Sequence, residues 1–260
     1  MCHADDSNPP PLPADLVRAR ALPPLAGGAA AEITTATSAD GTAFSIALAL
    51  SSQPRDPAVV IVPDVRGLYR FYADLAERFA AAGHHAVAID PFGRTAGTGE
   101  RPNDWDYWQH ALDSDPATIQ ADIAAACAVL RERGAATRFA VVGFCYGGSQ
   151  AFLAATNPDL PIDRVVGFYG GLSGERLQIP APRDEIAAAR VPVLGLFGDA
   201  DQGITEADRA TFAENLDRAG VPHEIHVYPG APHSFFDRKQ EEFADASADA
   251  WRRTLAFLAD

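Results

Sequence analysis

Short apolar runs alternate with longer segments of helical periodicity along most of the chain. Residues 58–62 (Ala-Val-Val-Ile-Val) form an unbroken apolar run, which is typical of a strand buried on both faces of a sheet. Further strands are predicted at residues 86–89, 139–142, 164–168, 191–197 and 224–228. Helices are predicted at residues 74–82, 117–133, 149–155, 206–219 and 241–258. This alternation predicts a mostly parallel central sheet with helices on both faces.

The start of the chain has a different pattern. Residues 33–37 and 41–50 predict antiparallel first strands, because the turn at Gly41 separates two strand-like segments. Residues 1–32 are rich in Pro, Ala and Gly and predict an arm rather than a packed domain. We therefore expect one α/β domain at residues 33–260, with an arm that covers it or supports a dimer.

Composition limits the partners and the compartment. The chain has 260 residues, of which 47% are hydrophobic, and its net charge of −14 argues against binding to nucleic acid or to an anionic membrane. Its three Cys residues are widely spaced and predict no disulfide framework. Cys2 and His3 have no second pair at zinc-site spacing. We expect a cytoplasmic monomer or homodimer without a metal, a membrane segment or a targeting leader.

The segment around Cys145 points to nucleophilic catalysis. The strand predicted at residues 139–142 runs into Gly143-Phe144-Cys145-Tyr146-Gly147, and a helix is predicted after it. This is the pattern of a nucleophile elbow with Cys at its apex, where larger residues than Gly143 and Gly147 would collide with backbone. A helix start also favours a thiolate and an oxyanion. A chance match around a packed core thiol is the alternative, and Cys127, amid a predicted helix, is expected to be such a core residue.

Other reactive side chains follow the predicted strands. In parallel sheets such groups gather where strands reach their carboxyl ends. Asp199 and Asp201 follow residues 191–197, and His233 follows residues 224–228. Nucleophile, acid and base then occur in the chain order of an α/β-hydrolase, with either Asp able to orient the imidazole. The other candidate bases, expected to be structural or solvent-facing, are His84, His85, His110, His223 and His226.

Further residues are expected to contact the substrate. The backbone N–H groups of Tyr146 and Val65 would form the oxyanion hole. Residues 98–115 are long for a connector and contain Trp105 and Trp108, which could form an aromatic lid over the pocket, with surface packing as the alternative. The remaining candidates for substrate binding are Arg66, Arg94, Ser234 and Phe235.

Five motifs in order resemble the dienelactone hydrolase (carboxymethylenebutenolidase) family of α/β-hydrolases. They are PDVRG, DPFGR, GFCYGG, GDAD and APHSFF, and the likeness runs from about residue 33 to the C-terminus. The resemblance implies Cys145 as nucleophile, Asp201 rather than Asp199 as acid, and His233 as base. It also implies hydrolysis of an enol-lactone, dienelactone to maleylacetate, through an acyl-cysteine without a cofactor or a metal.

Two positions depart from the family pattern. Asp64 stands where the family has a Glu that controls ionisation of the thiol, and Asp is one methylene shorter. The family binds a substrate carboxylate with two arginines, one matching Arg94. At the second position this chain has Asp237, with Arg238 one residue on. The alternatives to an esterase are a thiol-based redox or electrophile sensor and an interaction module without activity.

Overall fold

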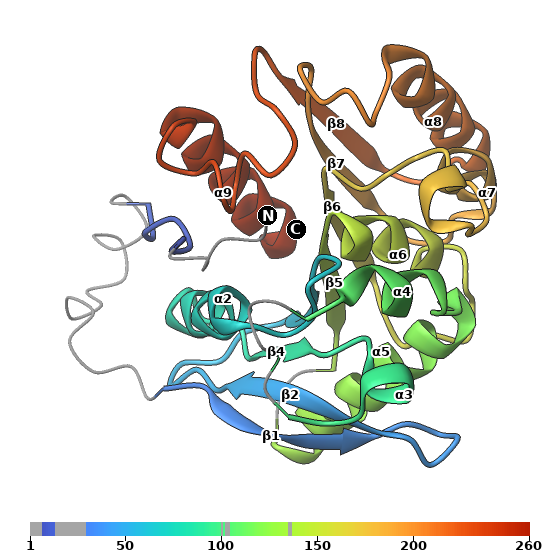
Figure 1. The fold of residues 1–260 in the computed structure, drawn as a ribbon. Coiled ribbons are helices and arrows are strands. Elements are labelled where there is room, and N and C mark those ends of the chain that lie inside the picture. The colour runs from blue at the N-terminus through green and yellow to red at the C-terminus, as the bar shows by residue number, and fades with distance from the viewer. Residues whose placement is uncertain (1–6, 14–29, 100, 102–104, 135–136) are drawn as a thin grey trace.

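The apolar runs become adjacent strands of one mixed sheet, shown nearly edge-on in Figure 1. The computed structural model describes residues 7–13, 30–99, 101, 105–134 and 137–260. In these residues the strands are β1 (Glu32–Thr37), β2 (Ala43–Ala49), β3 (Ala58–Val62), β4 (Ala86–Ile89), β5 (Phe139–Phe144), β6 (Arg164–Phe168), β7 (Val193–Gly198) and β8 (His223–Tyr228). Their order across the sheet is β1-β2-β4-β3-β5-β6-β7-β8.

Pairing within the sheet changes from antiparallel to parallel. Strands β1 and β2 are antiparallel, and β2 also pairs antiparallel with β4. Every pair from β4 across to β8 is parallel. The carboxyl ends of β3, β5, β7 and β8 therefore lie along the same edge, where the candidate reactive residues follow them.

Helices cover both faces of the sheet. The longer ones are α2 (Arg70–Ala81), α5 (Pro116–Glu132), α6 (Tyr146–Ala154), α8 (Glu206–Ala219) and α9 (Ala244–Ala259). Helices α2 and α9 lie on one face, and α5, α6 and α8 lie on the other (Figure 1). The short helices are α3 (Gly93–Ala96), α4 (Tyr107–Leu112), α7 (Pro182–Glu185) and the 3₁₀ turns Glu175–Leu177 and Ile186–Ala188. No helix of the described residues is long and apolar enough to cross a bilayer.

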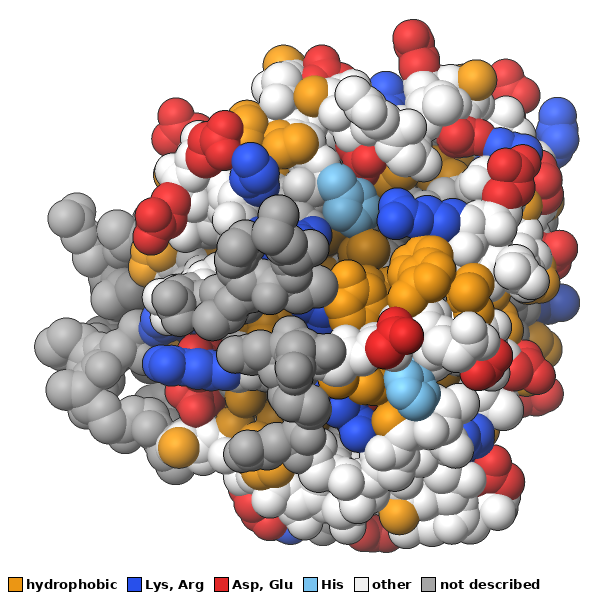
Figure 2. Space-filling model, in the orientation of Figure 1, with side chains coloured by type: hydrophobic (Ala, Val, Ile, Leu, Met, Phe, Trp, Pro, Cys, Tyr) orange, Lys and Arg blue, Asp and Glu red, His pale blue; other side chains and the backbone are white. Residues whose placement is uncertain are grey.

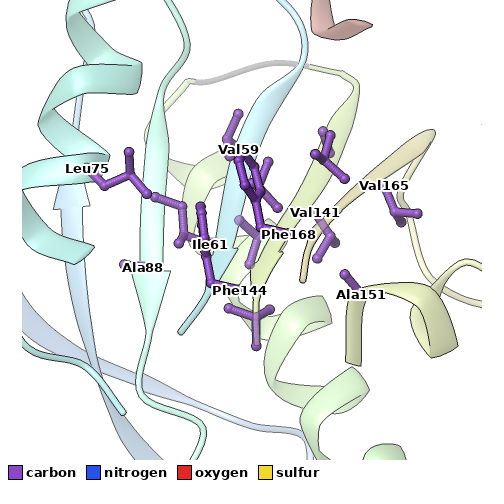
Figure 3. Close-up of a cluster of buried hydrophobic side chains, with 14 of the residues drawn as sticks. Val59, Ile61, Leu75, Ala88, Val141, Phe144, Ala151, Val165 and Phe168 are labelled. Atoms are coloured by element: carbon purple, nitrogen blue, oxygen red, sulfur yellow. The ribbon is translucent and has the colours of Figure 1, made fainter. Parts of the chain in front are cut away.

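The core lies between the sheet and these helices. Val59, Ile61 and Val141 are fully buried on the central strands, and Figure 3 shows them packed with Phe144 and Phe168. The rings of Phe144 and Phe168 stack with their centroids 4.6 Å apart. Because these strands are buried on both faces, their side chains do not alternate between apolar and polar.

Local signals begin and end the helices. Asp115 caps α5, because its side chain accepts a hydrogen bond from the N–H of Ala117 at 2.9 Å. Thr205 and Asp208 form a capping box at the start of α8, and Gly220 ends that helix in the left-handed conformation. Each of these signals is readable in the sequence.

The predicted fold class is confirmed, including the antiparallel first strands and helices on both faces. The helix predicted at residues 241–258 begins later, at Ala244, because the residues before it form turns. The short helices α3, α4 and α7 were not predicted, since one turn carries too little periodicity to be recognised. Within the predicted arm, Pro9, Pro10 and Leu12 are buried. Cys2 and His3 lie outside the described residues.

Helix α6 approaches the sheet so closely that two positions in its first turn, Gly147 and Gly148, have no room for a side chain. A Cβ on Gly147 would lie 2.0 Å from the carbonyl oxygen of Val62 on β3. A Cβ on Gly148 would lie 2.8 Å from the Cα of Gly170, just after β6. Real carbon atoms do not approach this closely, so the helix start depends on these glycines.

We expect Gly147→Ala to lower the free energy of unfolding by about 3 kcal/mol or more, because a new methyl group would force the backbones of α6 and β3 apart. Chemical denaturation measures this change. Gly171→Ala is the control, since its Cβ would meet only Ser149 Oγ, at an ordinary 3.5 Å. Equal stabilities of the two variants would contradict the expectation.

Candidate active site

Cys145 occupies a strained turn between β5 and α6. Its backbone has φ 54° and ψ −112°, in the left-handed half of conformational space that residues other than Gly rarely adopt. The Cys145 N–H donates to the carbonyl of Phe168 at 2.9 Å, and its own carbonyl accepts from the N–H of Ser149 at 3.2 Å. A Cβ on Gly143 would lie only 1.9 Å from the carbonyl oxygen of Gly147. These contacts hold the half-buried thiol at the start of α6.

His233 lies between Asp201 and Cys145. Its Nδ1 is 2.6 Å from Oδ2 of Asp201, a side chain that is only 4% exposed. The other carboxylate oxygen of Asp201 accepts a hydrogen bond from the N–H of Gly203 at 2.9 Å. The side chain of Cys145 also acts on this imidazole, since its charge raises the pKa of His233. The structure therefore brings thiol, imidazole and carboxylate together from the ends of β5, β8 and β7.

The surroundings of His233 favour its protonated form. Burial lowers the pKa of this imidazole, but the charge of Cys145 and the hydrogen bonds to Asp201 and Cys145 outweigh burial and raise it to about 10. A protonated imidazole beside a thiol and a buried carboxylate is the arrangement that a thiolate–imidazolium pair requires.

The rival candidates are engaged elsewhere. Asp199 accepts a hydrogen bond from the N–H of Gly230 at 2.5 Å and is exposed, so Asp201 is the carboxylate beside His233. The other imidazoles have separate partners: His84 the carbonyl of Pro57, His85 the N–H of Ser51, His110 the ring of Trp105, His223 the carbonyl of Val221, and His226 the side chains of Glu224 and Arg253.

The two predicted oxyanion donors flank this site. Tyr146 is the first residue of α6, where helix geometry leaves the N–H without an intrahelical acceptor. Val65 follows β3 and is half-buried. Within the described residues, neither N–H takes part in a backbone hydrogen bond. Their role in binding an oxyanion stays a prediction.

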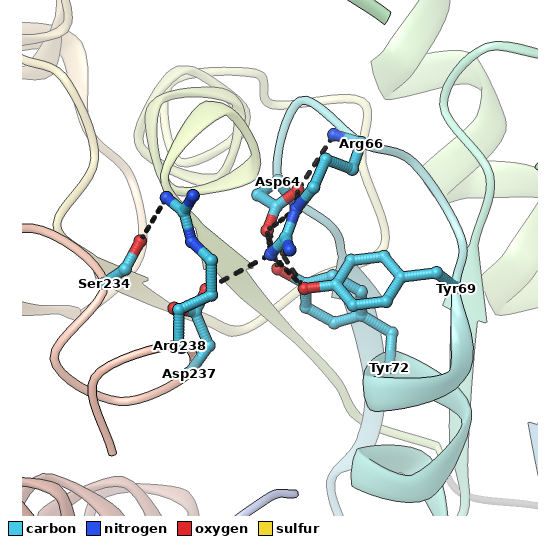
Figure 4. A network of polar contacts seen from close by, with 7 residues as sticks. All are labelled: Asp64, Arg66, Tyr69, Tyr72, Ser234, Asp237 and Arg238. Atoms are coloured by element: carbon cyan, nitrogen blue, oxygen red, sulfur yellow. Dashed lines mark hydrogen bonds and ion pairs between the residues drawn. The ribbon is translucent and has the colours of Figure 1, made fainter. Parts of the chain in front are cut away.

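Asp64 is held in a dense polar network, drawn in Figure 4. Its carboxylate pairs with Arg66, with Nη2 of the guanidinium 2.5 Å from Oδ2. The hydroxyl groups of Tyr69 and Tyr72 also donate to Oδ2, at 3.2 and 3.0 Å. Arg66 hydrogen-bonds the hydroxyl of Tyr69 as well. Donors from the loop after β3 and from α2 therefore balance the charge of Asp64. Control of the thiol by Asp64 stays a prediction.

Arg94 pairs with carboxylates of the fold. Its guanidinium lies 2.7 Å from Oδ2 of the buried Asp122 and 2.9 Å from Oδ2 of Asp40. These bonds connect α3 to α5 and to the turn before β2. A role for Arg94 in substrate binding stays a prediction, and these pairs do not favour it.

The predicted aromatic residues differ in burial: Trp105 and Trp108 are half-buried, and Phe235 is fully buried. Trp105 is half-buried against Phe92, and the guanidinium of Arg176 lies 4.8 Å from the ring centre of Trp108. Phe235 is fully buried beside Tyr169, as a core residue would be. Figure 2 shows hydrophobic side chains gathered near a histidine on one face of the molecule. Pockets that bind small organic molecules are lined mostly by apolar side chains, and the hydrophobic side chains on this face fit that requirement.

Sequence reasoning missed Tyr169 and Asp237 as neighbours of the site. The ring of Tyr169 lies 5.0 Å from that of His233, and its backbone has φ 39°. Its hydroxyl is buried and has no hydrogen-bond partner within the described ranges of the chain. Tyr169 comes directly after β6, so a search of every strand end would have found it. Asp237 was noted only as a departure from a family pattern, and no sequence signal shows that its side chain is buried.

A mixed sheet with antiparallel first strands, helices on both faces and an elbow after β5 defines the α/β-hydrolase fold. A crystal structure described as a putative dienelactone hydrolase from Klebsiella pneumoniae superposes with a TM-score of 0.75 at 27% identity, covering 88% of this chain and 99% of that one. A dienelactone hydrolase-like promiscuous phosphotriesterase from metagenomic libraries superposes with a TM-score of 0.63 at 21% identity, covering 89% and 98%, which shows the fold alone.

The model of the dienelactone hydrolase family matches residues 44–260, and the chain belongs to this family of hydrolases. A protein named putative carboxymethylenebutenolidase from Methylorubrum extorquens is 32% identical over 76% of this chain and 69% of its own length. A probable 2-oxo-3-(5-oxofuran-2-ylidene)propanoate lactonase from Bradyrhizobium sp is 30% identical over 78% and 84%. The resemblance to this family is confirmed.

We expect Cys145→Ala to lower the pKa of His233 from about 10, because the variant removes the charge and the hydrogen bond of the sulfur while burial remains. Titration of the imidazole followed by NMR measures this pKa. Cys127→Ala, which changes a buried thiol in α5, is the control and should leave it unchanged. A His233 pKa that is the same in all three proteins would contradict the expectation.

Proposed function

We propose that the protein hydrolyses small carboxylic esters or lactones through an acyl intermediate on Cys145. The observation that carries this proposal is the position of His233, which bonds Asp201 through Nδ1 and whose pKa is raised by Cys145, a residue at an elbow with strained backbone. A thiol, an imidazole and a buried carboxylate in this order form the arrangement of a Cys–His–Asp triad.

In the first step, the thiolate of Cys145 attacks the carbonyl carbon of the substrate. The oxyanion that forms accepts hydrogen bonds from the backbone N–H groups of Tyr146 and Val65. When the tetrahedral intermediate collapses, the bond from carbon to the leaving oxygen breaks, and the imidazolium of His233 gives its proton to that oxygen. The products are a thioester on Cys145 and an alcohol, which stays covalently attached when the substrate is a lactone.

The second step uses the same imidazole as a base. Acylation removes the negative charge of the sulfur, which is a main cause of the raised pKa of His233, while the burial that lowers this pKa remains. The neutral ring can then accept a proton from water as the water attacks the thioester. Release of the carboxylic acid restores the thiolate and the imidazolium. Asp201 keeps the ring oriented throughout, since it is bonded to Nδ1.

The relatives indicate the substrate class. One relative is named a putative carboxymethylenebutenolidase, and another is named a probable lactonase for an oxofuranylidene acid. Both names refer to a cyclic enol ester as the substrate. An enol leaving group is readily expelled by a thiolate. We therefore propose activated esters and enol-lactones as substrates, with no metal or cofactor required by the mechanism.

Cys145→Ala should reduce kcat/KM for para-nitrophenyl acetate by about a thousandfold or more, because no acyl-enzyme can form. Asp201→Asn should also reduce it strongly, because the imidazolium loses its buried counter-charge. Release of para-nitrophenol measures turnover, and intact-protein mass spectrometry detects the acyl group on the wild type.

Cys127→Ala is the matched cysteine control and should retain activity, since Cys127 is buried in α5. Full turnover by Cys145→Ala, or an acyl group mapped to another residue, would refute the mechanism.

A further inference from the structure

Asp237 is a buried carboxylate that the proposed mechanism does not use. Its side chain is fully buried, and it lies four residues after His233 along the same loop. One carboxylate oxygen accepts from the N–H of Arg238. The other, Oδ2, has no hydrogen-bond partner among the described residues and lies 3.8 Å from Nη2 of Arg66. A buried carboxylate with an unbonded oxygen is costly, so its presence calls for an explanation.

The charges around Asp237 cancel. Arg66 lies between two carboxylates, bonded to Asp64 and facing Asp237 (Figure 4). Arg238 is exposed, donates to the hydroxyl of Ser234 at 3.1 Å, and interacts electrostatically with both carboxylates. In the part of the chain that the structure describes, the group thus contains two guanidinium cations and two carboxylate anions. Without Asp237, two cations would face one anion.

This group lies within the electrostatic range of the reacting atoms. The loop that carries Asp237 also carries His233, and the loop that carries Arg66 also carries Val65. The charges of Asp237, Asp64 and Cys145 all act on the hydroxyl of Tyr169, whose ring packs against His233. An acyl group bound at Cys145 is therefore exposed to the net charge of the group.

We propose that Asp237 makes the site selective for esters and lactones with an uncharged acyl group, by cancelling the positive charge that Arg66 and Arg238 would offer to a carboxylate. The inference rests on the proposed function and specifies its substrate class. An anionic acyl group would have to approach a charge-balanced group and give up its hydration without gaining a net attraction. An acyl group without charge avoids that cost.

The test compares two para-nitrophenyl esters on one carbon frame, the hexanoate and the adipate monoester, which differ by a terminal carboxylate. For the wild type we expect kcat/KM to be about tenfold or more higher for the hexanoate. Asp237→Asn keeps the shape and removes the charge, and it should shift this ratio by about tenfold or more toward the adipate. Adding Arg238→Gln to this variant should reverse most of the shift.

Asp199→Asn is the matched control, because Asp199 is an exposed carboxylate bonded only to the N–H of Gly230 among the described residues. It should leave the ratio unchanged. A wild type that prefers the adipate, or an Asp237→Asn variant with an unchanged ratio, would overturn the proposal. If the wild type hydrolyses neither ester, the proposed function itself fails, and this outcome is distinct from a wrong preference.

A second measurement serves if Asp237→Asn does not fold. Burial and the charge of Asp64 raise the pKa of Asp237 to about 6, against the opposing effect of Arg66 and Arg238. The groups that face it are these three, with Tyr72 and Tyr169. Lowering the pH of the wild type from about 8 to about 5.5 protonates Asp237 and should move the ratio toward the adipate, whose own carboxylate stays mostly ionised. No movement would count against the proposal.

Discussion

The site depends on the close contact between the backbone of helix α6 and the backbones of β3 and β6. Gly147 fits against the carbonyl of Val62, and Gly148 fits against Gly170. This contact leaves the chain only one path from β5 into α6, and that path places Cys145 at a positive φ. The strain at this residue is sustained by the packing around it. The thiol of Cys145 and the N–H of Tyr146 both take their positions from this contact.

Electrostatics then determines what the positioned thiol can do. Burial alone would favour a neutral imidazole and a neutral thiol, since charged forms lose hydration. The charge of Cys145 and the hydrogen bond to Asp201 nevertheless raise the pKa of His233. Arg66 and Asp64 neutralise each other a short distance away. The region therefore holds many charges and little net charge, so the reacting pair is not dominated by a neighbouring ion.

The sequence was sufficient for the fold, and it singled out Cys145 and His233 as candidates before any contact between them was known. Buried parallel strands have long apolar runs, and the elbow needs glycines at fixed positions, so both leave a clear pattern. The burial of Asp237 and the pairing of Arg94 with Asp122 leave no pattern in the sequence. A charged residue in a loop has the same sequence context whether its side chain faces solvent or a partner. The choice of Asp201 over Asp199 likewise needed three-dimensional contact, apart from the family resemblance.

Among the described residues, residue 145 is fixed in its turn through its own main-chain atoms: its N–H donates to Phe168, its carbonyl accepts from the N–H and the hydroxyl of Ser149, and the neighbouring glycines pack against backbone. The backbone contacts therefore fix the direction of the side chain at residue 145, and they do not depend on whether its terminal atom is sulfur or oxygen. Sulfur and oxygen are interchangeable there as far as architecture is concerned. A change of nucleophile would alter reactivity and acidity while the turn that presents it stayed the same.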